Sequence, residues 1–320
     1  MKRFEDFAAI DAVLPWVDGS DPVLAARRRQ YAGGGELSNQ EVGGSSRYAS
    51  VGEIRWCVAS LLRYAPFIRK IFIVTDGQDP DLGGMLREHF PERVDDVAVV
   101  DHKVIFRGRE DALPTFNSNS IDTLVWNIPD LSEHFIYLND DYMLIRPTLP
   151  EDYFRGDKVV CYAKRLPARF VRLLRFLRPG HVGYKASMLR ALELTGGGAH
   201  IINLGHAPCP MLKSWFERWV EERPDMVALN LRDKFRHVEQ FEAQEPFYLD
   251  MERQGRLVLV SDLEASLCFK RRNVPGYVDR KLREFEADQT RKFVCFNALN
   301  LCTPEEIERV AAWLDARIGI

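Results

Sequence analysis

Acidic residues follow three short apolar runs of this sequence, and they are the first candidates for chemistry. Asp18 comes after residues 10–16, Asp76 after residues 70–75, and Asn139-Asp140-Asp141 after residues 135–138. Each run is short, apolar and closed by turn-forming or polar residues, which is typical of a buried strand. Ligands of open parallel α/β sheets bind beyond the carboxyl ends of the strands. We therefore expect these acids to gather at one edge of a sheet.

Asp140 and Asp141 are adjacent carboxylates, which repel each other unless a cation lies beside them. Carboxylate oxygens next to a diphosphate are the usual surroundings of Mg²⁺ or Mn²⁺. The alternative is a solvated turn at the end of a strand, where Asn and Asp are frequent. Because two further strand ends carry acids, we favour a metal site and expect Mg²⁺ (or Mn²⁺) as the cofactor.

The segment from Pro15 to Pro22 contains Trp16, Asp18 and Gly19. It is either a turn that needs glycine, or a site in which Trp16 offers a flat face to a base or sugar. In the second interpretation, Asp18 accepts hydrogen bonds from hydroxyl groups.

Basic and neutral polar side chains supply further candidates. His206 lies between Gly205 and Ala207-Pro208, and a histidine in such a loop is either a general base for a hydroxyl or a structural residue. Arg236 and His237 either bind phosphate oxygens or form a basic helix face. Residues 115–120 are rich in Thr, Asn and Ser, which favours a helix N-cap, hydrogen bonds to a sugar, or both.

Helical spacing follows the strands. Helices are expected at residues 51–64 with Ser50 as N-cap, after residues 117–119, and at 212–222, 235–254 and 304–317; a weaker strand is expected at 94–101. Alternating strands and helices predict a mostly parallel, Rossmann-like or GT-A-like α/β sheet flanked by helices. We expect one catalytic domain over residues 1–320. In it, residues 1–160 form the α/β core that binds the metal, and residues 161–320 form a helical cap and closing region.

Composition excludes several classes of protein. The 44 Lys+Arg and 47 Asp+Glu residues give a net charge of −3, so no nucleic-acid partner is expected. The 46% hydrophobic content is that of a globular chain, and no apolar run reaches the ~18 residues of a membrane span. The scattered cysteines and the polar start predict reduced thiols, no zinc site and a cytoplasmic protein. Residues 163–178 alternate Arg with Phe and Leu; they are either an interfacial helix at the inner face of the membrane, which would make a peripheral membrane contact, or a lid helix with a solvated basic face.

Taken in order, these motifs resemble the Stealth family of phosphotransferases. The family's first region is similar to Trp16-Val17-Asp18-Gly19-Ser20-Asp21. The parts that resemble its second region are Arg47, the stretch around Glu53, and residues 60–66, 71–78, 113–118 and 131–141. Its third region resembles His206-Ala207-Pro208 with Phe235-Arg236-His237. Its fourth resembles residues 293–297, where Ala298 stands in place of the family's usual Asp.

The resemblance implies a reaction: a nucleotide-activated sugar, such as UDP-N-acetylglucosamine, gives sugar 1-phosphate to a hydroxyl of an oligo- or polysaccharide acceptor, and UMP leaves. The resemblance also implies a role in capsule or exopolysaccharide synthesis, and it makes residues 1–160 the core that would bind the nucleotide sugar. Asp140 and Asp141 would hold the metal, Arg47 and Arg236 would stabilise the transferred phosphoryl group, and His206 would be the base, with Asp18 as its competitor. The expected substrate-binding residues are Trp16, Gly19, Glu53, Asp76, Asn117, Ser118, Asn139, His237 and Asn297.

Two other functions remain open from the sequence. A metal-dependent GT-A-like glycosyltransferase would have a similar sheet and similar strand-end acids, and would release UDP in place of UMP. An inactive sugar- or nucleotide-binding module is the second alternative, for which Ala298 is the argument.

Overall fold

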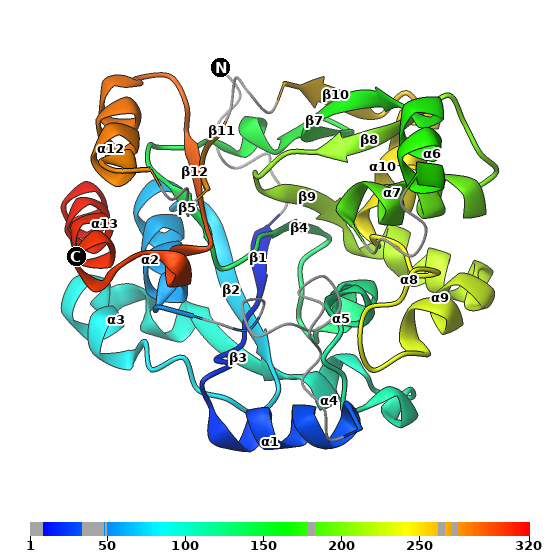
Figure 1. The fold of residues 1–320 in the computed structure, drawn as a ribbon, viewed down its shortest axis with the longest axis horizontal. Helices are drawn as coiled ribbons and strands as arrows, with labels where there is room; N and C mark the ends of the chain where they lie inside the picture. The colour runs from blue at the N-terminus through cyan, green and yellow to red at the C-terminus, as the bar shows by residue number, and fades with distance from the viewer. Residues whose placement is uncertain (1–8, 34–47, 49, 178–182, 262–265, 271–273) are drawn as a thin grey trace.

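A five-stranded sheet lies at the centre of the molecule (Figure 1). The computed structural model describes residues 9–33, 48, 50–177, 183–261, 266–270 and 274–320. The strand order is β3-β2-β1-β4-β9, in which the first four strands are parallel and β9 is antiparallel to β4. Their bounds are β1 Ile10–Pro15, β2 Ile68–Thr75, β3 Val97–Asp101, β4 His134–Tyr137 and β9 Cys209–Leu212. The prediction of a mostly parallel α/β sheet is confirmed.

Strand β1 is the middle of this sheet because its side chains are almost all apolar and can be buried on both faces. The exception is Asp11, whose side chain is fully buried. Its carboxylate accepts hydrogen bonds from Arg69 Nη2 at 2.6 Å and from the Ser132 backbone N–H at 2.7 Å. A buried carboxylate is tolerated when it is paired in this way. Asp11 therefore ties β1, β2 and the turn before β4 together at the end opposite to the strand-end acids.

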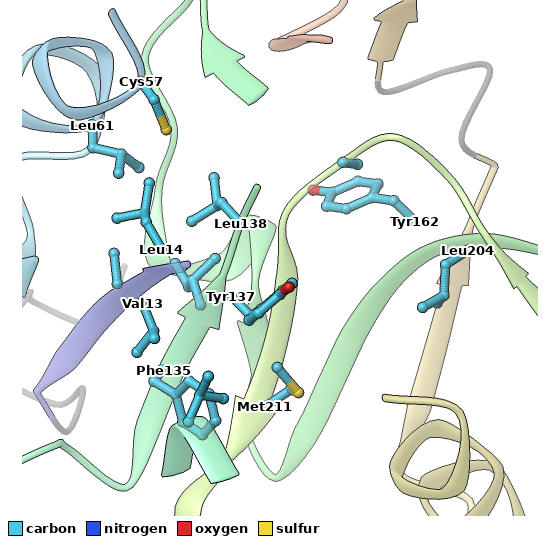
Figure 2. Packing of buried hydrophobic residues seen from close by; sticks show 14 of the residues in the cluster. Val13, Leu14, Cys57, Leu61, Phe135, Tyr137, Leu138, Tyr162, Leu204 and Met211 are labelled. Carbon is cyan, nitrogen blue, oxygen red and sulfur yellow. The ribbon is translucent and has the colours of Figure 1, made fainter. Parts of the chain in front are cut away.

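Helices cover the sheet on both sides. In the first half they are α1 Pro22–Tyr31, α2 Glu53–Tyr64, α3 Gly83–His89, α4 His102–Ile105 and α5 Ser118–Leu124. Figure 2 shows Leu61 and Cys57 of α2 directed toward Leu14 of β1 and Leu138, which follows β4. The structure begins α2 at Glu53 and not at residue 51, and Gly52, with φ 92°, takes the N-cap position predicted for Ser50.

The second half contributes strands as well as helices, so the expectation of a helical cap is incomplete. One additional sheet contains β6 Phe154–Arg155, β7 Lys158–Pro167, β8 His200–Leu204 and β10 Leu257–Val260; the other contains β5 Tyr142–Leu144, β11 Ser266–Lys270 and β12 Phe293–Asn297. The helices are α6 Ala168–Leu177, α7 Tyr184–Leu194, α8 Lys213–Glu222, α9 Pro224–Leu231, α10 Gln244–Arg253, α12 Tyr277–Ala287 and α13 Pro304–Ile318.

Two helix predictions need correction. Residues 163–167 belong to strand β7, so within the described part of the basic stretch the helix covers residues 168–177. Pro167 marks the change, because proline ends a strand and is accepted at the start of a helix. The helix expected at 235–254 begins only at Gln244, and residues 235–243 form an irregular segment.

Within the described residues, no helix is both long and apolar enough to cross a bilayer. All six cysteines fall among the described residues, and none of them forms a disulfide there.

Candidate active site

Two cavities open at the carboxyl ends of the central strands. The strand-end cavity, of about 600 Å³, is lined by Trp16, Glu53, Asp76, Asp140 and Phe116 among others. The His206 cavity, of about 740 Å³, is lined by His206, Tyr142, Tyr184, Lys185 and Arg175 among others. Both cavities are lined by the same six side chains: Ser118, Tyr137, Asn139, Asp141, Arg236 and Asn297. We call these six residues the shared wall. Groups bound in the two cavities would meet at this wall.

The turn that carries the acids is held by strand β12. The Tyr142 backbone N–H donates to the Asn139 carbonyl at 3.1 Å, and the Phe296 N–H donates to the Asp141 carbonyl at 2.9 Å. This second bond aligns Asn297, the next residue of β12, with the acidic turn. Sequence reasoning placed Asn139, Asp141 and Asn297 at the site, and all three line the shared wall.

The electrostatics of the acidic turn are unfavourable in the protein alone. Burial, with the neighbouring charges of Asp141 and Glu53, raises the pKa of Asp140 well above its usual range. Burial, with the charge of Glu53, raises the pKa of Asp141 to about 6, although the Cys295 thiol donates to its Oδ2 at 3.4 Å. Asp141 Oδ1 is buried and has no hydrogen-bond partner among the described residues. A positive charge at this position would relieve all three features.

The donor set fits Mg²⁺ in the form that this ion usually takes. Mg²⁺ keeps several waters and binds one or two carboxylates together with substrate phosphates. Asp140 and Asp141 supply two carboxylates that face the strand-end cavity. Among the residues that the structure describes, no group of three His, Cys, Asp or Glu side chains could hold a metal ion. An ion here would therefore depend on oxygens from its substrate.

Arg236 is fixed at the shared wall by polar contacts from two directions. Its Nε donates to Ser118 Oγ at 3.0 Å, and its Nη1 lies 3.8 Å from Glu242 Oε1. The Arg236 side chain is only 16% exposed, so its charge acts in surroundings that water screens poorly. A guanidinium held in this way is suited to bind phosphoryl oxygens.

Asn117 positions the Arg236 segment and does not face either cavity. Its Nδ2 donates to Gln240 Oε1 at 2.8 Å and to the carbonyls of Asp233 and Phe235, while its Oδ1 accepts from the Asn119 N–H. The side chain is fully buried, so it cannot reach a sugar hydroxyl as the sequence analysis expected. It instead holds residues 233–240 in place through these hydrogen bonds. The predicted N-cap of helix α5 is confirmed.

His206 follows strand β8 in an irregular segment. The Gly205 N–H donates to the Tyr162 carbonyl at 2.8 Å, which fixes the backbone just before the imidazole. His206 Nδ1 lies 3.4 Å from Tyr142 Oη. The ring therefore stands next to β5 and faces the His206 cavity, on the other side of the shared wall from Trp16.

Aromatic rings line the strand-end cavity. Trp16, Tyr48 and Phe116 all face it, and Trp16 Nε1 is buried with no hydrogen-bond partner in the described part of the chain. Tyr48 Oη donates to the Phe116 carbonyl at 2.7 Å. A Cβ on Gly19 would lie 2.2 Å from the Tyr48 carbonyl oxygen, so glycine is required by this close approach. Gly19 accordingly acts by positioning Tyr48 and is absent from both cavity linings.

Several predicted residues lie elsewhere or have other partners. Asp18 accepts from the Ser20 N–H at 2.8 Å and from Ser20 Oγ at 2.6 Å, and it lines neither cavity. His237 is outside both cavities and contacts Arg232 and Glu239. Asp76 and Glu53 line the strand-end cavity as expected, although Asp76 also pairs with Arg27 at 2.6 Å. Arg47 lies outside the described residues.

Two acidic residues that line the His206 cavity were not predicted from the sequence. They are Asp122 and Glu242, and both are buried. Tyr137 Oη lies 2.8 Å from Asp122 Oδ1 and 3.2 Å from Asn139 Oδ1. Burial and the charge of Glu242 raise the pKa of Asp122 to about 7. The only signal in the sequence was its position four residues after Ser118, on the same face of helix α5.

The chain also matches two regions defined in known proteins. Residues 9–36 match Stealth protein conserved region 1, and residues 47–162 match Stealth protein conserved region 2. The chain belongs to the Stealth family. The resemblance seen in the first two regions of the sequence is thereby confirmed, and Stealth conserved region 2 contains Ser118, Asp122, Asn139, Asp140 and Asp141.

Relatives of this Stealth chain are named as polysaccharide phosphotransferases. An exopolysaccharide phosphotransferase of Streptomyces coelicolor is 43% identical over 228 residues, which are 71% of this chain and 37% of the relative. One of Lactiplantibacillus plantarum is 38% identical over 46% of this chain and 40% of its own length. A capsular polysaccharide phosphotransferase of Streptococcus pneumoniae is 35% identical over 48% and 43%. The chain thus spans less than half the length of these curated relatives.

Among solved structures, the galactosyltransferase LgtC in complex with donor and acceptor sugar analogs aligns with this Stealth chain at a TM-score of 0.48. The two chains are 13% identical, and the alignment covers 96% of this chain and 95% of that one.

Proposed function

We propose that this chain transfers sugar 1-phosphate from a nucleotide sugar to a hydroxyl of a saccharide acceptor in capsule or exopolysaccharide synthesis. The observation that carries the proposal is the shared wall, where Arg236, Ser118 and Asp141 line both cavities. A transferase for two substrates needs two binding spaces that meet at a charged centre. The names of the Stealth relatives favour a phosphoryl group as the part transferred.

The donor is assigned to the strand-end cavity. Trp16, Tyr48 and Phe116 give it flat apolar faces, which suit a nucleobase, and the acidic turn lines the same cavity. A UDP-sugar such as UDP-N-acetylglucosamine is the donor we propose. Asp140 and Asp141 would hold Mg²⁺ (or Mn²⁺), which supplies positive charge opposite the diphosphate.

The acceptor is assigned to the His206 cavity. Its lining mixes hydrogen-bonding groups with aromatic faces, namely Asn203, Gln244, Lys185, Tyr142 and Tyr184. Sugars are bound by such a mixture, because each ring has both hydroxyl edges and apolar faces. The cavity is also large enough for more than one sugar ring, at about 740 Å³.

The residues divide the reaction between them. The acceptor oxygen attacks the phosphorus that bears the sugar, while His206 takes the proton of that hydroxyl. The bond from this phosphorus to the bridging oxygen of the diphosphate breaks, and UMP leaves with the bridging oxygen. Arg236, oriented by Ser118 and Glu242, stabilises the charge on the transferred phosphoryl oxygens. A phosphodiester between the two saccharides is formed.

Identification of the released nucleotide tests this function. The protein is incubated with UDP-N-acetylglucosamine, Mg²⁺ and a panel of capsule-type oligosaccharides, and nucleotides are separated by anion-exchange chromatography. UMP that depends on both metal and acceptor supports the proposal. UDP would instead indicate glycosyl transfer, and binding of the donor without release of either nucleotide would indicate a binding module.

A further inference from the structure

Helix α6 carries an apolar face that is exposed on the surface, next to the opening of the His206 cavity, which Leu174 also lines. Phe170, Leu173, Leu174 and Leu177 recur at i, i+3, i+4 and i+7, so they form one stripe, and Phe176 lies next to it. All five are exposed, with Phe176 at 81% and Leu177 at 64%. The outer face of a surface helix is ordinarily polar. This stripe therefore needs a partner outside the described fold.

The inner face of the same helix is already packed against the protein. Ala168 and Val171 are buried, and α6 packs beside α7 and over β8 (Figure 1). Helix α6 thus has two apolar faces. The face with Ala168 and Val171 anchors the helix to the protein, and the exposed stripe is a separate face.

The charge around this stripe is mainly positive. Residues 158–192 contain nine Lys and Arg and no Asp or Glu, although the whole chain has a net charge of −3. Arg169 and Arg172 are exposed on α6, beside the stripe. Arg172 and Arg175 both lie near one acid, Glu193 of α7, at 3.4 and 3.3 Å. One carboxylate shared by two guanidinium groups leaves the surface positive.

We propose that helix α6 docks this protein on an anionic lipid bilayer. Helices that lie in the membrane interface combine Phe and Leu on one face with Arg or Lys at its borders, as α6 does. Aromatic and leucine side chains of the stripe would enter the headgroup region, while Arg169 and Arg172 would approach lipid phosphates. Of the two interpretations of this stretch, the interfacial helix explains the outward Phe and Leu, which a solvated lid helix does not.

The docked orientation has a consequence for the acceptor. Leu174 and Arg175 of α6 line the His206 cavity. Docking through α6 would therefore hold this cavity next to the lipid surface, where a saccharide carried on a lipid would be presented. This consequence rests on the proposed function, whereas the docking itself does not.

Vesicle flotation tests the docking without any use of activity. The protein is mixed with vesicles of phosphatidylcholine, or of phosphatidylcholine with 30% phosphatidylglycerol, at low and high salt. We expect flotation with the anionic vesicles only, and its loss at high salt. Phe176→Ser should lower the partition coefficient about tenfold or more, and Arg169→Gln about fivefold.

Matched variants separate this effect from a general loss of apolar or basic surface. Leu149→Ser removes an exposed leucine elsewhere, and Arg29→Gln removes an exposed arginine of α1; both should float like the parent. Because Phe176 has few contacts to lose, its replacement should leave the melting temperature unchanged. Equal flotation with both vesicle types, or none with either, would overturn the proposal. A dimer seen by light scattering and abolished by Phe176→Ser would overturn it too, since the stripe would then bind a second copy of the chain.

Discussion

Arg236 Nε donates to Ser118 Oγ at 3.0 Å, on the wall that the strand-end cavity and the His206 cavity share. The two residues are 118 positions apart in the sequence. They meet because the backbone N–H of Phe116 donates to the Lys234 carbonyl at 2.9 Å, and because Asn117 clamps residues 233–240. This contact places a fixed positive charge where the proposed transfer occurs.

Replacement of Arg236 should affect turnover more than donor binding. Loss of one preorganised donor to a developing charge typically costs a factor of about 10²–10³ in kcat. We expect this loss for Arg236→Gln, and a smaller loss, about tenfold, for Ser118→Ala, which only frees the guanidinium. Arg232→Gln, at an exposed ion pair outside both cavities, is the control. Nucleotide release with unchanged kcat in Arg236→Gln would contradict the role of this residue.

His206 is expected to act on the acceptor. His206→Gln should lower kcat about 10²–10⁴-fold, because the attacking hydroxyl loses its base. The Kd of the donor, measured by calorimetry, should stay within about twofold of the parent, since the imidazole faces the other cavity. His89→Gln, on helix α3, should behave like the parent. A His206 variant that turns over normally would move the search for the base to Asp122, in the same cavity.

Asp141 offers a readout of metal binding that does not depend on turnover. In the presence of UMP, MgCl₂ should raise the melting temperature of the parent protein, because a ligand that binds only the folded state stabilises it. The shift should be absent in Asp141→Asn and retained in Asp95→Asn, an exposed acid. Without metal, Asp141→Asn should melt above the parent, since it removes a carboxylate whose pKa is raised to about 6 by burial. A full Mg²⁺-induced shift in Asp141→Asn would contradict the metal assignment.

Asp122 predicts a specific dependence of stability on pH. Its pKa is raised from 3.8 to about 7 in the folded protein, so the native state binds the proton more tightly than the unfolded chain does. This contribution is complete below about pH 4 and is lost as the pH rises through 7. Between these two limits, the loss lowers the free energy of unfolding by roughly 4 kcal/mol. Urea unfolding at pH 5 and pH 8 should therefore show a smaller pH-dependent loss in Asp122→Asn than in the parent, and an equal loss would show that Asp122 is ionised throughout.

The sequence was most informative where local pattern and position agree. The strand-end acids could be grouped because parallel strands end at the same edge, and Asp76, Asp140 and Asp141 do line one cavity. Asn117 was recognised as a helix cap from its residue type. Its contacts with residues 233–240 could not be foreseen, because they depend on chain segments more than one hundred residues away.

The second half was harder to predict because its strands do not follow one another in regular βα order. Strand β9 joins the central sheet antiparallel to β4, and β5 pairs with β12, which is about 150 residues further along the chain. Such pairings have no local signature. Asp122 was missed for a similar reason, since an acid on a short helix resembles a solvated residue until Glu242 and Tyr137 are brought to it by the fold.

The most direct test of the proposed reaction follows the phosphorus that bears the sugar. A UDP-N-acetylglucosamine labelled with ³²P at this position is incubated with the protein, Mg²⁺ and an acceptor saccharide, and the saccharide is separated from the nucleotides. Transfer of sugar 1-phosphate predicts that the label enters the saccharide in a phosphatase-resistant diester while unlabelled UMP is released. Label that stays with the nucleotide as UDP, while the sugar is transferred, would contradict the account.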